Sequence, residues 1–236
     1  MLYNRYNEIL YTIIHPERNT DMNTAFVFNS KIKPSVSLNY LVALPENHNK
    51  EEKLPMIVFL HGAGERGTDV EKVKIHGLAK TYEKHTPRGF IVLSPQCPND
   101  RVWDNFVEEL MELIELVAEQ YGADKKRISI TGLSMGGFGT WIMGITYPNY
   151  FSAMAPICGG GMEWRAGCLK DVPIKAFHGV LDAVVPVKRS IEMVKAVNRA
   201  GGKATITLYG KIGHNSWDLA YMGSELVDWL ISNEKN

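Results

Sequence analysis

Residues 128–141 read ISITGLSMGGFGTW, and this stretch decides the fold. A β-branched run enters the pentapeptide GLSMG, which is centred on Ser134, and small residues that can begin a helix follow it. This is the G-x-S-x-G pattern in a strand–turn–helix context. A serine at the tip of so sharp a turn needs neighbours with almost no side chain, and the glycines on either side supply that room. The alternative is a glycine-rich turn in which the serine has no chemical role. Whether residues that could activate Ser134 occur elsewhere in the sequence distinguishes the two interpretations.

The composition fits a globular α/β protein with a sizeable core. The chain has 236 residues, of which 45% are hydrophobic and 22% are charged. Lys+Arg and Asp+Glu both number 26, so the formal net charge is zero and favours neither nucleic acid nor an anionic membrane surface as a partner. Cys97, Cys158 and Cys168 show no metal-ligand spacing, and reduced thiols are the expectation. The sequence does not determine the oligomeric state.

The N-terminal residues do not resemble a targeting segment. No apolar core follows a basic start, and no window approaches eighteen apolar residues. We therefore expect a cytoplasmic location, or secretion if a leader was removed. Residues 1–20 are ambiguous, because the spacing of their apolar side chains suits a helix while their residue types also suit strands. These side chains are Tyr3, Tyr6, Leu10 and Ile13.

Strands and helices alternate along most of the chain. Strands are predicted at 25–29, 37–43, 56–60, 90–93, 128–131, 153–157, 174–178 and 204–208. Helices are predicted at 101–121, 138–147, 187–200 and 225–231, with partial helical character at 70–84 and a glycine-rich connection at 159–171. No linker interrupts this order. We predict a single domain over 1–236, with N-terminal strands and a loop in 1–50 and the catalytic core in 54–232. Its sheet is doubly wound and mostly parallel, with helices on both faces.

Two polar residues follow later strands in positions that suit partners of Ser134. Asp182 comes four residues after His178 at the end of one predicted strand, and His214 follows the last predicted strand. A serine hydroxyl becomes a nucleophile when a histidine takes its proton and a carboxylate orients that histidine. The order Ser, Asp, His with each residue after a strand is the one that this chemistry uses in α/β sheets. Taken alone, Asp182 could cap a turn and His214 could be an ordinary loop residue.

A charge that develops on a substrate oxygen also needs backbone donors. The N–H of Met135 follows the serine directly, and the loop HGAGERG (61–67) follows the third predicted strand. We predict that Met135 and Ala63 supply the two N–H groups. A phosphate-binding loop is the alternative, but this segment lacks both the P-loop ending and the G-x-G-x-x-G spacing. His61 is expected to brace this loop, and His178 is expected to be structural.

Four segments in this order resemble the α/β-hydrolase superfamily: LPMIVFLHGAGERG, ITGLSMGGFGTW, HGxxD at 178–182 and GHNSW at 213–217. They are most similar to compact carboxylesterases and feruloyl-type esterases related to the catalytic domain of prolyl oligopeptidases. The similarity covers about residues 36–232. It implies a serine esterase that uses Ser134, Asp182 and His214 without a metal or cofactor, and that has at most a small lid.

Tryptophans near the expected site suggest an aromatic pocket. Trp103, Trp164 and Trp217 are the candidates, although each could instead pack a loop onto the core. Glu65 and Arg66 could hold the loop that contains Ala63 or bind a polar group of the substrate.

These residues predict an ester hydrolase that acts on short-chain or aromatic esters, such as feruloyl or acetyl-sugar esters. The alternatives are a peptidase or amidase of the prolyl oligopeptidase type, a lysophospholipase or thioesterase, and a catalytically silent binding module. The expected partner is a small or carbohydrate-linked ester.

Overall fold

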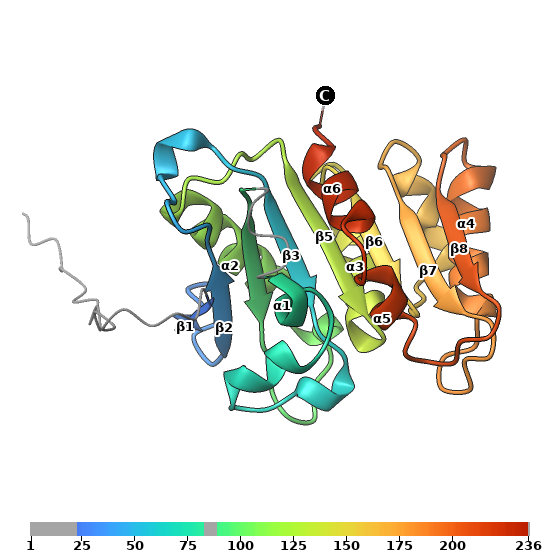
Figure 1. The fold of residues 1–236 in the computed structure, drawn as a ribbon, viewed down its shortest axis with the longest axis horizontal. Helices are drawn as coiled ribbons and strands as arrows, with labels where there is room; N and C mark the ends of the chain where they lie inside the picture. Colours follow the sequence, from blue (N-terminus) through green and yellow to red (C-terminus); the bar gives the residue numbers. More distant parts are fainter. Residues whose placement is uncertain (1–22, 83–88, 236) are drawn as a thin grey trace, which may run out of the picture.

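One eight-stranded sheet organises the chain in the computed structural model, which describes residues 23–82 and 89–235 (Figure 1). The spatial order is β1-β2-β4-β3-β5-β6-β7-β8. Strands β1 and β2 pair antiparallel, as do β2 and β4, and every neighbouring pair from β4 to β8 is parallel. The predicted α/β fold with one mostly parallel sheet is confirmed. The ambiguous segment 1–20 lies outside the described residues.

The elements have the following bounds. The strands are β1 Asn23–Asn29, β2 Ser37–Ala43, β3 Met56–Leu60, β4 Ile91–Pro95, β5 Ile128–Leu133, β6 Met154–Ile157, β7 Lys175–Gly179 and β8 Thr205–Tyr209. The α-helices are α1 Gly77–Thr81, α2 Val107–Gln120, α3 Met135–Thr146, α4 Lys188–Arg199, α5 Trp217–Ala220 and α6 Glu225–Ser232. The 3₁₀ helices are η1 Lys50–Glu52, η2 Ala63–Glu65, η3 Val70–Ile75, η6 Trp103–Phe106 and η7 Glu163–Leu169.

Helices cover both faces of the sheet (Figure 1). The larger buried cluster packs α2, α3 and α4 against one face and includes Leu113, Trp141 and Val197. The smaller cluster packs α1, α5 and α6 against the other face. Strands β3 and β5 are buried along their whole length, as expected for continuous apolar strands at the centre of a parallel sheet. No helix in 23–82 or 89–235 is both long and apolar enough to span a bilayer.

Short elements account for most differences from the predicted pattern. Helix α3 begins at Met135 rather than at 138, so the turn at Ser134 leads directly into the helix. The predicted glycine-rich connection contains η7, and the four-residue helix α5 was not predicted. Elements of this length hold too few residues to show a periodic pattern, which is why the sequence does not reveal them.

The sheet register places several loops side by side at one edge. Leu60 at the end of β3 pairs with Gly132 in β5, and Leu133 pairs with Ile157 at the end of β6. Strands β7 and β8 continue this arrangement, with Gly179 opposite Tyr209. Because parallel strands all end at the same edge, the loops that follow them can converge on one site.

Candidate active site

Ser134 lies at the tip of the turn between β5 and α3 in a backbone conformation that is rare for a residue with a side chain. Its φ is 52° and its ψ is −117°. The turn is held because the Ser134 N–H donates to the carbonyl oxygen of Ile157 at 2.9 Å. Close backbone approach explains the glycine at 136, because a Cβ there would overlap the carbonyl oxygen of Leu60. The surrounding sheet thus maintains a strained conformation that presents the serine hydroxyl.

The structure brings Ser134, His214 and Asp182 into one hydrogen-bonded chain. His214 Nε2 lies 2.8 Å from Ser134 Oγ, and His214 Nδ1 lies 2.8 Å from Asp182 Oδ2. The three residues come from the loops after β5, β7 and β8. The imidazole is partly exposed whereas the carboxylate of Asp182 is inaccessible to solvent. Side chains that are 48 and 32 residues apart in sequence therefore meet as predicted from their positions after strands.

Backbone donors hold the Asp182 carboxylate from the side opposite His214. The N–H groups of Val184 and Val185 each donate to Oδ1 at 2.9 Å. Burial by itself would raise the pKa of Asp182, but the hydrogen bond from His214 and these two backbone bonds outweigh it and lower the pKa. Asp182 is therefore ionised at neutral pH and can only accept hydrogen bonds.

The negative charge of Asp182 determines the tautomer of His214. Because Asp182 only accepts, the Nδ1 atom of His214 carries a proton and donates it to Oδ2. In the neutral ring, Nε2 then has a free lone pair, which accepts the hydroxyl proton of Ser134. The geometry therefore presents a serine hydroxyl to a base that is already correctly oriented.

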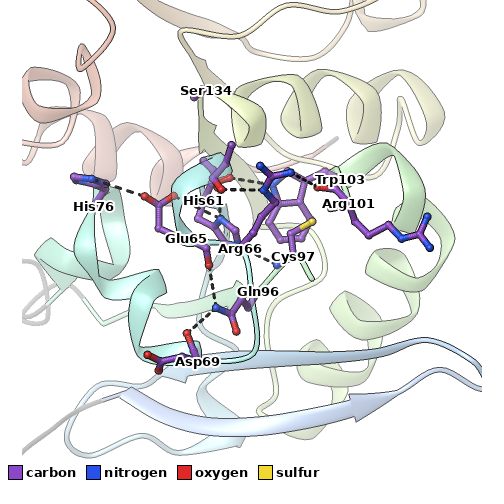
Figure 2. A network of polar contacts seen from close by, with 12 residues as sticks. His61, Glu65, Arg66, Asp69, His76, Gln96, Cys97, Arg101, Trp103 and Ser134 are labelled. Carbon is purple, nitrogen blue, oxygen red and sulfur yellow. Dashed lines mark hydrogen bonds and ion pairs between the residues drawn. The ribbon is translucent and has the colours of Figure 1, made fainter. Parts of the chain in front are cut away.

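The loop after β3 is anchored by the buried ring of His61, as Figure 2 shows. The backbone N–H of Cys97 donates to His61 Nε2 at 2.9 Å, so the ring proton lies on Nδ1. Nδ1 donates to the carbonyl oxygen of Gly62 at 2.5 Å. The N–H of a trans peptide points opposite to its C=O, so the Ala63 N–H is directed away from this ring. His61 thus fixes the orientation of the peptide whose N–H was predicted as a donor.

Glu65 and Arg66 also hold this loop. Arg66 Nε donates to the carbonyl oxygen of Ala63 at 2.9 Å, and Arg66 Nη1 donates to that of Arg101 at 3.2 Å. The carboxylate of Glu65 is buried, and its oxygens lie 3.6 Å from His61 Nδ1 and 3.8 Å from His76 Nε2 (Figure 2). Burial raises the pKa of Glu65, but these rings and the Gly62 N–H outweigh it and lower the pKa. Of the two predicted roles, the structure favours holding the loop.

The structure gives different outcomes for the three tryptophans, and the prediction that Trp103 lines a substrate pocket is wrong. Trp103 is 0% exposed and its Nε1 donates to the carbonyl oxygen of His61 at 3.0 Å, so it supports the loop from below instead of lining a pocket. Trp217 is 9% exposed and its ring packs edge-on against His214, 5.2 Å between centroids. Trp164 is 75% exposed on η7. Only Trp217 is thus in contact with the hydrogen-bonded chain.

The sequence analysis did not predict two buried neighbours of the hydrogen-bonded chain formed by Ser134, His214 and Asp182. His178 is a neighbour of Asp182, with its Nε2 atom 3.2 Å from Oδ2. Cys158, with a positive φ of 39°, lies close enough that its sulfur, Asp182 and His214 offer ligand atoms within 4.8 Å of one another. His214 Nδ1 and Asp182 Oδ2 already form a hydrogen bond with each other, so we assign no metal to this group. Burial raises the pKa of the Cys158 thiol to about 12, which disfavours a thiolate nucleophile.

Comparison with known proteins identifies relatives of this chain. The Esterase family model matches residues 34–219, which include β2 through β8 and all three residues of the hydrogen-bonded chain. A crystal structure of a thermostable esterase superimposes with a TM-score of 0.80 at 34% identity, over 91% of this chain and 64% of that one.

Comparison of sequences finds further relatives, two of which are described here by their names. Acetylxylan esterase A of Emericella nidulans is 32% identical over 104 residues, which are 34% of this chain and 34% of the relative. A protein named "Probable feruloyl esterase C" of Aspergillus terreus is 26% identical over 159 residues, or 65% of this chain and 58% of the relative. The chain therefore spans less than two thirds of the length of each of these three relatives.

Proposed function

Because this chain belongs to the Esterase family, we propose that it is a serine carboxylic-ester hydrolase that works through an acyl-enzyme intermediate. The observation that carries the proposal is the continuous chain from Ser134 Oγ through His214 to the ionised Asp182. Each link has the donor and acceptor that proton transfer from the serine requires.

The reaction follows from these positions. His214 Nε2 accepts the hydroxyl proton as Ser134 Oγ attacks the ester carbonyl carbon, and the carbonyl oxygen becomes an oxyanion. Asp182 stabilises the imidazolium that forms. His214 then returns the proton to the departing alcohol, leaving an acyl-serine. Water attacks this ester in the same way, which releases the acid and restores Ser134.

Ala63 and Met135 are the proposed donors to the oxyanion. Each is the first residue of a helix, η2 and α3 respectively, where a backbone N–H has no acceptor within the helix. The pairing of Leu60 with Gly132 supports a shared site, because it places the loops after β3 and β5 next to each other. Donors fixed before the reaction stabilise the transition state without reorganising, and each typically contributes about 3 kcal/mol.

For the substrate we propose water-soluble esters with short or aromatic acyl groups, including those on sugars. The names of the acetylxylan and feruloyl relatives support this class. The connection between β6 and β7 contains only the short helix η7 and offers no large flap for a lipid surface.

A fluorophosphonate probe tests the nucleophile directly, because it forms a covalent bond only with an activated serine. We expect the native protein to be labelled at Ser134, and Ser134→Ala to remain unlabelled. Ser35→Ala is the matched control, since Ser35 is an exposed serine of the β1–β2 turn, and it should label like the parent. Absence of labelling in the folded native protein would instead favour a binding module. Faster cleavage of aminoacyl amides than of aryl esters would favour a peptidase.

A further inference from the structure

One end of the sheet has a face that is left partly open. Helix α4 packs against β7 and β8 from one side, whereas α6 packs against β3 and β5 on the other side. Strand β8 is the last strand of the sheet. Among the residues that the structure describes, the face of β7 and β8 opposite α4 is therefore bordered only by α5 and the segment that leads into α6 (Figure 1).

A groove of about 230 Å³, which we call the β7–β8 groove, lies on this open face. Its wall includes Leu219 of α5 and Leu226 of α6. The volume is below the roughly 300 Å³ of enclosed ligand pockets, as expected for a shallow site that holds only part of a longer molecule. The floor consists of alternate residues of the two strands, which point to the same face: Lys175, Phe177, Thr205, Thr207 and Tyr209.

Two aromatic rings give the β7–β8 groove a flat apolar surface. The rings of Phe177 and Tyr209 stack with their centroids 6.5 Å apart and their planes 19° from parallel. Tyr209 lies opposite Gly179 in the sheet, and the absence of a side chain there leaves room for its ring to lie toward Phe177. Both rings are half-buried, so part of each is accessible to a ligand. Such a surface favours a ligand that presents a flat face of C–H groups.

Polar groups surround the two rings and can form further hydrogen bonds. Within residues 23–82 and 89–235, the hydroxyls of Thr207 and Tyr209 have no hydrogen-bond partner. Burial and the nearby charge of Glu225 raise the pKa of Tyr209, so its hydroxyl keeps the proton that it can donate. Lys175 Nζ lies over the ring of Trp229, 4.7 Å from its centroid. One acidic and one basic side chain line the groove, which favours a ligand without net charge.

The β7–β8 groove leads toward the loops that carry Asp182 and His214. The N–H of Val180, at the start of the loop with Asp182, donates to the carbonyl oxygen of Tyr209 at 3.0 Å. Helix α5 connects the two places from the other side, because Trp217 at its start packs against His214 while Leu219 lies in the groove wall. A long molecule bound in the groove would therefore extend toward the edge of the sheet that carries Ser134.

We propose that the β7–β8 groove binds sugar rings of a neutral oligosaccharide and so holds a carbohydrate-linked ester beside Ser134. A sugar ring has faces of apolar C–H groups and a rim of hydroxyls, which match the aromatic rings and the polar groups around them. A wholly apolar ligand would instead leave these polar groups unpaired. The inference rests on the proposed function for the ester, whereas binding of the sugar itself needs no reaction at Ser134.

Titration of the native protein with unesterified xylohexaose, followed by ¹H–¹⁵N NMR, tests binding without ester chemistry. We expect the shifted amides to lie in β8 and in residues 219–226. Tyr209→Ala removes the stacked ring and should weaken binding by about 2- to 10-fold, whereas Tyr209→Phe keeps the ring and should lose less. Phe26→Ala is the matched control and should bind like the parent. Phe26 is also half-buried, stacks on Tyr40 with centroids 5.4 Å apart, and belongs to the strand at the opposite end of the sheet.

Turnover links the β7–β8 groove to the ester. In Tyr209→Ala, the ratio of kcat/KM for an acetylated xylo-oligosaccharide to kcat/KM for nitrophenyl acetate should fall by the same factor as the affinity. Should this variant fail to fold, Thr207→Val removes an exposed hydroxyl of the groove and should also weaken binding.

Three results would overturn the inference: no binding of the oligosaccharide, shifts confined to other surfaces, or equal affinity in Tyr209→Ala and the native protein. Shifts in the groove that grow with protein concentration in the absence of sugar would also overturn it, because they would assign this face to a second copy of the chain. Native protein that binds the sugar at the groove but does not react with a fluorophosphonate would support the groove and refute the proposed function.

Discussion

At the scale of single residues, the site depends on one residue with an unfavourable backbone conformation and one with a buried charge. Ser134 has a positive φ, a conformation that costs a residue with a side chain on the order of 1–3 kcal/mol. Asp182 is ionised although its side chain is buried, because three hydrogen bonds, from His214 and from the N–H groups of Val184 and Val185, lower its pKa. Both conditions persist only because neighbouring strands and loops hold them.

Replacing the nucleophile tests the chemistry without disturbing the packing. Ser134→Ala removes one oxygen and keeps the Cβ, so we expect a folded protein with an unchanged melting temperature. The kcat for a nitrophenyl acetate should fall by about 10⁴- to 10⁶-fold, because covalent catalysis is lost. Activity within tenfold of the parent would refute the role of Ser134.

The lowered pKa of Asp182 gives its contribution to stability a definite pH dependence. A depressed carboxyl pKa stabilises the fold above the unfolded value of about 3.9, and this contribution is lost as the pH falls through the folded pKa. The difference in unfolding free energy between the native protein and Asp182→Asn should therefore be constant from about pH 6 upward and shrink below pH 4. Urea unfolding at several pH values measures it, and a difference that is independent of pH would contradict the expectation.

At the scale of elements, the approach of α3 to β3 determines where Ser134 points. The helix begins immediately after the serine, and Gly136 in its first turn lies against the last carbonyl of β3. The loop after β3 is in turn supported by the indole of Trp103, which lies at the start of η6. The turn and the loop are thus fixed by the same group of packed elements.

Adding one methyl group to Gly136 should separate α3 from β3. We expect Gly136→Ala to lower the melting temperature strongly or to prevent soluble expression, because the new Cβ overlaps the backbone of Leu60. Gly223→Ala is the control, since a Cβ at Gly223 meets nothing within 4 Å. Thermal unfolding of both variants measures the effect, and equal melting temperatures would show that the helix can shift at little cost.

Removing the indole N–H should weaken the support of the loop after β3. Trp103→Phe keeps an aromatic ring but leaves the buried carbonyl oxygen of His61 without this donor, at an expected cost of about 1–3 kcal/mol. Trp164→Phe makes the same change at an exposed position and should stay within about 0.5 kcal/mol of the parent. Chemical denaturation of both variants tests this, and similar losses would mean that the indole hydrogen bond contributes little.

At the scale of the whole molecule, a parallel sheet collects loops from distant parts of the chain at one edge. The strand order places β3 and β6 on either side of β5, with β7 and β8 beyond β6 (Figure 1). Ser134 therefore has the loop of Ala63 on one side and the loops of Asp182 and His214 on the other. An ester bound at this edge would lie between the proposed donors to its oxyanion and the proposed base, His214.

The short loops at the edge of the sheet that carries Ser134 lead to a prediction about substrates. Among nitrophenyl esters of increasing acyl length, we expect kcat/KM to be highest for short chains and methyl ferulate to be accepted. No large flap covers the site among the described residues, so the rate should not jump when a substrate exceeds its solubility limit. A rate that rises toward long chains, or jumps where micelles form, would indicate a lipase.

Local patterns in the sequence were sufficient to predict the sheet and the three residues of the hydrogen-bonded chain. The bounds of β2 and β3 match the prediction, since continuous apolar runs and turn residues are properties of neighbouring residues. Ser134, Asp182 and His214 could be selected because each follows a strand, and strand ends share an edge in a parallel sheet. These inferences need only the order of elements.

Contacts between side chains from different elements were decided by the tertiary structure alone. Trp103 was expected in a pocket, but the absence of a side chain on Gly139 lets its indole pack into the core beneath His61. The loop after β7 folds back and places Asp182 against the ring of His178, a contact that the order of elements does not predict. Which face a side chain occupies and which atom it meets depend on register and packing between distant segments, because these set distances that no local pattern contains.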